Sequence, residues 1–361
     1  MFTGANTIVL DMVARVEETQ QPELAMDVDL SVDESAGTDP VSVNLTVLPL
    51  VSADGKRLGT MVMMEDISGE KRVRSTMARY MDPGLADQLV RRDEEILGGK
   101  STEATLLFSD VRGFTTLAEG LGPQGTVALL NEYFTLMVEC IQEQGGMLDK
   151  FIGDAIMAAF GLPIAHEDDP DRGVRAAIAM ITSMFEWNER RVADGRVPID
   201  MGIGLNTDLV VAGNIGSPKR MDFTMIGDGV NLASRLESAC KQYNARILIS
   251  EHTFHRLKGV YRTREVDHVI VKGKTEAVGV CEVLDYHTSA TFPNLSDAVH
   301  AFRDGIEYYR RGDWDRAVRS FAQALTANPE DALSQTYIDR CEQLKADPPA
   351  DWSGIWAMTS K

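Results

Sequence analysis

The sequence is poor in cysteine and has no long apolar run, and both absences narrow the class of protein. Its four cysteines, Cys140, Cys240, Cys281 and Cys341, stand far apart without CxxC spacing, which argues against a disulfide framework or zinc cluster. No apolar stretch approaches the roughly 18 to 20 residues of a membrane-spanning helix. The N-terminus lacks the basic flank, apolar stretch and cleavage site of a secretory signal. We therefore expect a cytoplasmic protein without a membrane span.

Positive charge is also scarce. The chain has 36 Lys and Arg against 55 Asp and Glu, a formal net charge of −19. Nucleic acids and anionic membranes bind basic surfaces, so neither is an expected partner. A phosphorylated small substrate is not excluded, because divalent metals on carboxylates and a few local basic residues can reverse the field at one site.

The N-terminal segment, residues 1–68, contains a predicted hairpin. Apolar runs at 41–50 and 58–68 flank a turn at 53–55, which is typical of two paired strands. The stretch EDIS, followed by EKR over residues 70–72, resembles the last strand of a PAS sensor domain. We interpret 1–68 as a partial PAS-like sensor segment, with an unrelated small β-cap as the alternative.

Residues 69–100 form a predicted helical linker. Val73, Met77 and Tyr80 recur at helical spacing, and Asp82 with Pro83 is typical of a new helix start. The apolar stripe is narrow, so it fits either a solvated linker or a dimer seam. We favour the seam.

Residues 101–288 alternate apolar strands with amphipathic helices. The pattern includes strands at 199–205 and 208–215, a helix through 230–239 and a final strand pair around Lys272 and Lys274. Mixed elements with strand hairpins favour an α+β, ferredoxin-like sandwich over a doubly wound parallel sheet.

The last segment, 289–361, carries one tetratricopeptide-like unit and a tail. The residues at that repeat's offsets are Gly305, Tyr308, Ala317, Phe321, Ala324 and Pro329. About three repeats are needed to bury their own faces. We therefore expect a helix pair packed on a neighbour rather than a free-standing binding array.

The first motif with chemical potential is LLFSDVRGF. An apolar strand ends at Asp110 and Val111, and a turn through Gly113 leads to a helix starting at Phe114. A carboxylate there can hold a metal, while backbone N–H groups of the turn and helix start can bind phosphate. Taken alone, Asp110 could equally be a helix cap.

The second motif is DKFIGDAIMAAFG, in which Asp154 lies at a predicted hairpin tip. A Gly-Asp pair is usually only a turn. Asp154 could, however, join Asp110 around two divalent ions roughly 4 Å apart. Lys150 is an unusual residue for such an apolar strand.

The third motif is DFTMIGDGVNLASRLE. Asn231 and Arg235 are four residues apart and therefore share one helix face. Helix surfaces often carry both residue types. Their place just after a glycine-containing helix start is the unusual feature, because polar groups there can converge on an anion.

Together, residues 101–286 resemble the catalytic domain of class III adenylyl and guanylyl cyclases, most closely bacterial adenylyl cyclases with Thr at a base-reading position. The resemblance implies that Asp110 and Asp154 bind two Mg²⁺ (or Mn²⁺) ions per site with the Val111 carbonyl, and that Gly113 and Phe114 lie at the phosphates. It implies further that Lys150 and Thr224 read the purine, Asn231 holds the ribose, Arg235 meets the α-phosphate and Lys272 contacts the terminal phosphates.

The resemblance also implies an assembly and a reaction. ATP would be converted to cyclic AMP in a head-to-tail homodimer with two shared sites, the acidic pair coming from one copy and the base-reading and arginine side chains from the other. Bicarbonate is a candidate activator, because Thr224 groups the chain with cyclases described as bicarbonate-responsive.

Donor and acceptor patterns favour ATP over GTP. Lys150 only donates, which matches adenine N1 and opposes the N1–H of guanine, whereas the hydroxyl of Thr224 can serve either base.

Three other interpretations of the chain remain. A diguanylate cyclase would need a GGDEF-type turn where this chain reads FIGDA. A degenerate nucleotide-sensing scaffold is disfavoured because no expected catalytic position is missing. In the third interpretation the tetratricopeptide-like tail carries the main function, with the cyclase domain as its cargo.

Overall fold

The computed structural model divides into two compact units, Met1–Arg91 and Arg92–Lys361. The structure describes residues 6–31, 40–69, 71, 99–217, 220–270, 277–349 and 351–354. Most of the predicted linker 69–100, and the predicted phosphate contact Lys272, lie outside the described residues.

The first unit is a small sheet with one helix against it. Its described elements are α1 (Thr7–Thr19), β1 (Glu23–Leu30), β2 (Val41–Val51) and β3 (Arg57–Asp66). These strands pair antiparallel in the order β1-β2-β3. Val9, Met12 and Val16 share one face of α1 and pack with Leu45 and Val47 in a common core.

The hairpin predicted at 41–68 is confirmed as β2 and β3. Its turn contains Gly55 with φ +75°, a conformation that glycine adopts without strain. The helix and strand before this hairpin were not foreseen from the sequence, and the PAS-like interpretation stays a prediction.

The second unit contains a larger mixed sheet with helices. In chain order its described elements are β4 (Lys100–Val111), α4 (Phe114–Glu143), β5 (Met147–Ile152), β6 (Ala155–Phe160), α5 (Asp169–Ala193), β7 (Met201–Ser217), β8 (Arg220–Ile226), α6 (Asp228–Gln242), β9 (Ile247–Ser250), α7 (Glu251–Phe254), β10 (Thr263–Ile270), β11 (Ala277–Val283), α8 (Leu295–Arg310), α9 (Trp314–Ala327) and α10 (Ala332–Ala346).

The strand order of this sheet is β10-β11-β9-β7-β4-β6-β5, and β8 pairs with β7 outside that path. From β4 to β7 the chain runs β-α-β-β-α-β, with β4 antiparallel to both β6 and β7. That succession and order are typical of a ferredoxin-like core. The α+β fold expected from the sequence is therefore present.

One stretch differs from the prediction. The two strands expected at 199–205 and 208–215 are one continuous strand, β7. The polar break between them is buried: Asn206 donates to the carbonyl of Gly229 and accepts from the hydroxyl of Ser250. A buried polar side chain whose hydrogen bonds are made can remain within a strand.

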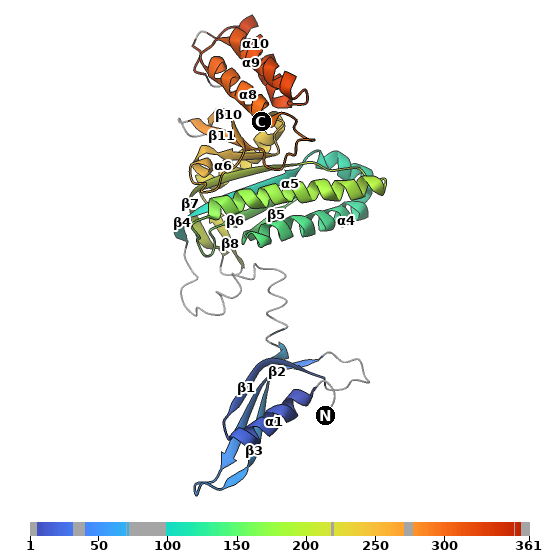
Figure 1. Cartoon of the computed structure of the whole chain (residues 1–361), viewed down its shortest axis with the longest axis vertical. Helices are drawn as coiled ribbons and strands as arrows, with labels where there is room; N and C mark the ends of the chain where they lie inside the picture. The colour runs from blue at the N-terminus through green and yellow to red at the C-terminus, as the bar shows by residue number, and fades with distance from the viewer. Residues whose placement is uncertain are drawn as a thin grey trace. The chain divides into compact units, whose positions relative to one another are not determined.

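Helices cover the two faces of the sheet. Along β4, Leu107 packs toward α4 and α5, whereas Leu106 and Phe108 belong to the core on the opposite face, as period-two alternation requires. Figure 1 shows α4 and α5 side by side across one face. Ala233 of α6 joins the core on the other face.

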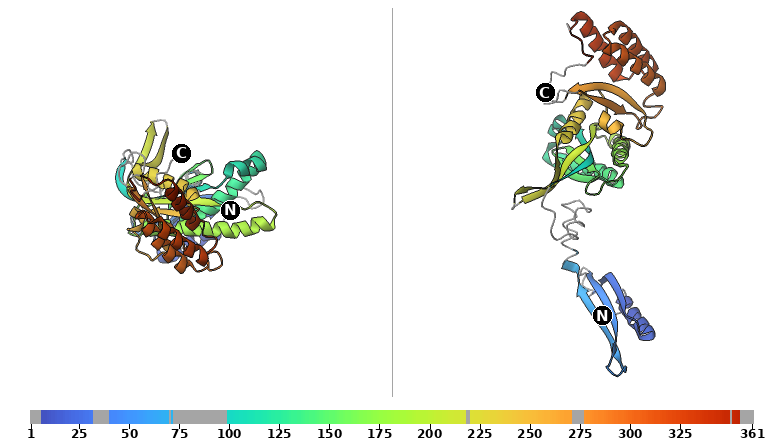
Figure 2. Two further views of the ribbon diagram at one scale, coloured as in Figure 1. Left: turned by 90° about the horizontal axis from the view of Figure 1, so that it is seen from above. Right: turned by 90° about the vertical axis from the view of Figure 1, so that its left-hand side faces the viewer.

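The C-terminal helices α8, α9 and α10 share a core with the edge of this sheet. Phe302, Phe321 and Tyr337 pack in the same cluster as Val266 and Val280 of β10 and β11, and Figure 2 shows these helices beside those strands. The expected packing on a neighbour is therefore internal to the second unit. The tetratricopeptide-like designation stays a prediction.

Two absences expected from the sequence can be compared with the structure. All four cysteines are buried and unpaired. Within the described ranges, no helix has the length and apolar character required to cross a bilayer.

Candidate active site

Two carboxylates meet where β4 ends. Pairing of Ser109 with Ile156 aligns the end of β4 with the β5–β6 turn, which contains Gly153 at φ +67° and then Asp154. Burial, followed by the hydrogen bond and negative charge of Asp154, raises the pKa of Asp110 to about 6. The structure therefore brings the two predicted metal ligands into direct interaction.

This acidic pair has the chemistry of a divalent-cation site. Two half-buried carboxylates repel each other unless a proton or a cation lies between them, and carboxylate oxygens are the ligands that Mg²⁺ prefers. In the described part of the chain, no three Asp, Glu, His or Cys side chains gather as a metal site. Further ligands would have to come from backbone such as the carbonyl of Val111, from water or from substrate.

The start of α4 lies just beyond the pair. Gly113 precedes the helix in the left-handed conformation, with φ +66°. Among the described residues, a Cβ built on Gly113 would meet no heavy atom within 4 Å. Phe114 then opens the helix, whose first backbone N–H groups have no partner within the helix and can bind an anion.

A third acidic side chain, Glu237 of α6, interacts electrostatically with the pair. Burial, and next the charge of Asp110, raises the pKa of Glu237 to about 7. Gly204 of β7 permits this approach, because a Cβ there would lie 2.2 Å from the backbone N of Glu237. Sequence reasoning missed Glu237, since only the Asn231 and Arg235 face of the helix was considered.

The geometry of α6 directs Asn231 and Arg235 away from their own acidic pair. An α-helix turns about 100° per residue, so Arg235 and Glu237 are roughly 200° apart while Asn231 and Arg235 are about 40° apart. Both Asn231 and Arg235 are exposed. Because Glu237 lies against Gly202 and Gly204 of β7 in the same chain, the face with Asn231 and Arg235 points to the outside of the unit.

The two predicted base-reading residues meet at a carboxylate that sequence reasoning did not single out. Thr224 of β8 donates to Oδ2 of Asp149 at 3.1 Å, and Nζ of Lys150 lies 3.5 Å from the same oxygen. Lys150 and Thr224 are 74 residues apart in the chain, so only the folded sheet brings them together. Lys272 lies outside the described residues, and its contact with the terminal phosphates stays a prediction.

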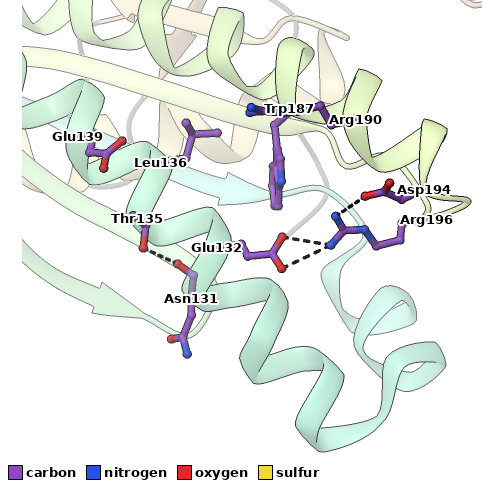
Figure 3. Close-up of a pocket in the computed structure, with 9 residues that line it drawn as sticks. All are labelled: Asn131, Glu132, Thr135, Leu136, Glu139, Trp187, Arg190, Asp194 and Arg196. Atoms are coloured by element: carbon purple, nitrogen blue, oxygen red, sulfur yellow. Dashed lines mark hydrogen bonds and ion pairs between the residues drawn. The ribbon is translucent and has the colours of Figure 1, made fainter.

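A separate groove of about 600 Å³ runs between α4 and the end of α5. Figure 3 shows Arg196 between Glu132 and Asp194 at its rim. The lining residues are Asn131, Glu132, Thr135, Leu136, Glu139, Trp187, Arg190, Asp194 and Arg196. None of them is a predicted site residue, so this groove is distinct from the acidic pair.

Comparison with known proteins agrees with this fold. Residues 99–282 match the family model described as the adenylate and guanylate cyclase catalytic domain. A Dictyostelium discoideum protein named adenylate cyclase, terminal-differentiation specific, is 34% identical over 243 residues, which cover 66% of this chain and 11% of that protein. An Anabaena cylindrica adenylate cyclase is 38% identical over 196 residues, covering 52% of this chain and 38% of its own length.

A solved structure of a bacterial light-regulated adenylyl cyclase is also similar. It aligns with a TM-score of 0.54 at 25% identity, over 62% of this chain and 63% of that one. The chain belongs to the family of adenylate and guanylate cyclase catalytic domains. It spans 11% and 38% of the lengths of the two curated relatives.

Proposed function

We propose that this protein is an adenylyl cyclase that converts ATP into 3′,5′-cyclic AMP and pyrophosphate at sites shared between two copies of the chain. The observation that carries the proposal is the contact between Asp110 and Asp154 at the end of β4. The family and the two curated relatives named adenylate cyclase support it.

In this reaction the ribose 3′-oxygen attacks the α-phosphorus, the bond to pyrophosphate breaks and the 3′-hydroxyl proton is released. Asp110 and Asp154 would hold two divalent ions, Mg²⁺ or Mn²⁺, which when bound supply acidification of that hydroxyl and neutralisation of phosphate charge. Arg235 would stabilise charge that develops on the α-phosphate, and Asn231 would orient the ribose.

A shared site follows from the orientation of α6. Arg235 lies on the helix face opposite Glu237, which packs against β7 and interacts electrostatically with the acidic pair of the same chain. Arg235 would therefore serve the acidic pair of a second copy. Apolar side chains exposed on the β7–β8 hairpin also favour self-association: Leu209, Val211, Met221 and Ile226. This hairpin stands out from the body of the second unit in both views of Figure 2.

Base recognition falls to Lys150 and Thr224, which lie together against Asp149. Lys150 can donate to adenine N1, which makes ATP the preferred substrate. Bicarbonate activation rests on Thr224 alone, and turnover that stays flat across a bicarbonate titration at fixed pH would exclude it. We place the reaction in cytoplasmic signalling.

Turnover of ATP and of GTP, each with Mg²⁺ and with Mn²⁺, tests the activity directly when the cyclic product is identified. We expect cyclic AMP from ATP, abolished by a chelator and by Asp110→Asn. A preference for GTP would contradict the base assignment. Formation of no cyclic nucleotide under either metal would contradict the proposed function itself.

Mixing two inactive variants tests the shared site. In an equal mixture of Asp110→Ala and Arg235→Ala chains, half of the dimers are mixed and each contains one intact site of two, so about a quarter of wild-type activity should return. The matched control mixes Asp110→Ala with Asp154→Ala, where no intact site can form. If activity returned equally in both mixtures, or returned in neither, the result would count against sites shared between chains.

A further inference from the structure

Asp149 occupies an irregular position in β5. The register of β5 against β6 shifts between Leu148 and Lys150, so Asp149 is the extra residue of a β-bulge. Bulges redirect side chains and are frequent beside active sites. Here the side chain of Asp149 is fully buried, with 0% exposure, while that of its neighbour Lys150 is 41% exposed.

The carboxylate of Asp149 uses its two oxygens unequally. Oδ2 accepts from Thr224 at 3.1 Å and lies 3.5 Å from Nζ of Lys150. Oδ1 is buried without a hydrogen-bond partner among the residues that the structure describes. Burial raises the pKa of Asp149, and Lys150 and then Thr224 act against that rise. Burying a carboxylate with one unpartnered oxygen costs free energy, and a side chain that served only to fill space would not need that charge.

The contact with Asp149 determines what Thr224 can offer a base. A hydroxyl has one proton to donate and lone pairs with which to accept. Because Thr224 donates its proton to Asp149, only lone pairs remain for a ligand. Such an oxygen accepts from the 6-amino group of adenine and repels the 6-oxo group of guanine. The ambiguity of a threonine at this position is thereby removed.

The same carboxylate acts on Lys150. Oδ2 of Asp149 lies 3.5 Å from Nζ and attracts the ammonium group toward Thr224, which shares the same oxygen. A donor-only group matches N1 of adenine and opposes N1–H of guanine. One buried side chain therefore biases both base-reading residues in the same direction.

We propose that Asp149 is a positioning residue that fixes Thr224 as a hydrogen-bond acceptor and holds the donor Lys150 beside it, and so selects 6-aminopurine over 6-oxopurine nucleotides. This inference rests on the proposed cyclase function and adds a determinant of its substrate specificity. Asp149 acts through Lys150 and Thr224 and does not itself touch the substrate.

The test is Asp149→Asn in the full chain, with kcat and KM measured for ATP, GTP and purine riboside triphosphate, which lacks the 6-amino group. The asparagine amide can donate to Thr224 and release its proton toward the base. We expect kcat/KM for ATP to fall about 10- to 100-fold, mostly through KM, with no comparable fall for GTP. The loss for purine riboside triphosphate should be smaller than that for ATP.

Matched variants separate this role from a general loss of structure or charge. Asp222→Asn on β8 removes another carboxylate that acts electrostatically on Asp149, and it should leave the ATP to GTP ratio within about twofold. Thr224→Ser keeps the hydroxyl and should keep the preference, whereas Thr224→Val should lose it. If Asp149→Asn does not fold, as judged by thermal unfolding, the two Thr224 variants decide the question.

Equal losses for ATP and GTP in Asp149→Asn, or an unchanged ratio, would overturn the inference while leaving the cyclase function in place. If the wild-type chain does not cyclise ATP, the proposed function fails on that result alone. The role of Asp149 is then decided by equilibrium binding of ATP and GTP to the wild type and to Asp149→Asn, where an unchanged affinity ratio would refute it.

Discussion

Replacing Asp331 with alanine should destabilise the entire second unit, although Asp331 lies far from the acidic pair in sequence. Asp331 precedes α10 and is 2% exposed at its side chain. It accepts from Arg264 of β10 at 2.8 and 2.9 Å. Arg264 also donates to Glu282 of β11 at 2.6 Å and is itself only 5% exposed. The substitution removes one of two carboxylates that face a buried guanidinium group.

The expected magnitude follows from this burial. Removing one partner from a buried ion pair costs about 3–5 kcal/mol in free energy of unfolding. Because Glu282 still pairs with Arg264, we take the lower end, about 3 kcal/mol. For a unit of this size each kcal/mol shifts Tm by roughly 2–4 °C, so Asp331→Ala should lower Tm by about 6–12 °C.

Thermal unfolding monitored by circular dichroism measures this change in Tm. The matched control is Asp315→Ala, which removes an ion pair with Lys345 at a site where Asp315 is 70% exposed. An exposed pair contributes about 0–1 kcal/mol, so that variant should melt within about 4 °C of the wild type. Equal Tm values for the two variants would refute the view that α8–α10 are integral to the folded unit.

Three further outcomes are expected. Gly204→Ala places a methyl group 2.2 Å from the backbone N of Glu237, so α6 must move and the urea midpoint should fall by an amount equivalent to about 1–3 kcal/mol or more; an unchanged midpoint would contradict the close approach. Burial, and then Arg246, lower the pKa of His287 to about 4. The imidazole is therefore protonated near pH 6.5 in the unfolded chain but stays neutral in the folded chain down to about pH 4. The free energy of unfolding should fall by on the order of 2 kcal/mol as pH drops from about 6.5 toward 4. His287→Gln should reduce the difference in Tm between pH 7.5 and pH 5, and an unchanged difference would contradict this role of His287. Arg235→Ala should lower kcat by about 10²- to 10³-fold with Tm unchanged, because the side chain is exposed; a large loss of Tm would assign Arg235 a structural role instead.

The sequence allowed prediction of the elements whose residues lie close together in the chain. The strand ending at Asp110, the turn with Asp154 and the helix with Asn231 and Arg235 follow from local patterns. That Asp110 and Asp154 interact depends on the register of β4 and β6, and it could be inferred only from the combination of motifs.

The remaining site features depend on geometry that alternation and spacing do not show. In the sequence Asp149 looks like an ordinary strand residue. Its burial follows from the register shift between β5 and β6, which the sequence does not show. In the sequence Glu237 is an ordinary polar helix residue. Its burial depends on Gly204, which lets α6 approach β7 closely. The break predicted within β7 was wrong because Asn206 finds its partners on α6 and β9, which are remote in sequence.

The core shared by the sheet edge and the C-terminal helices has a practical consequence. Removing α8–α10 would uncover Val266 and Val280 and take Phe302 and Tyr337 out of the core that they share with Tyr243 at the end of α6. A shortened chain would thus lose solubility and helix placement together. Low turnover after such a deletion would report collapse of the scaffold that holds Arg235, and could not be taken as proof that the tail transmits a signal.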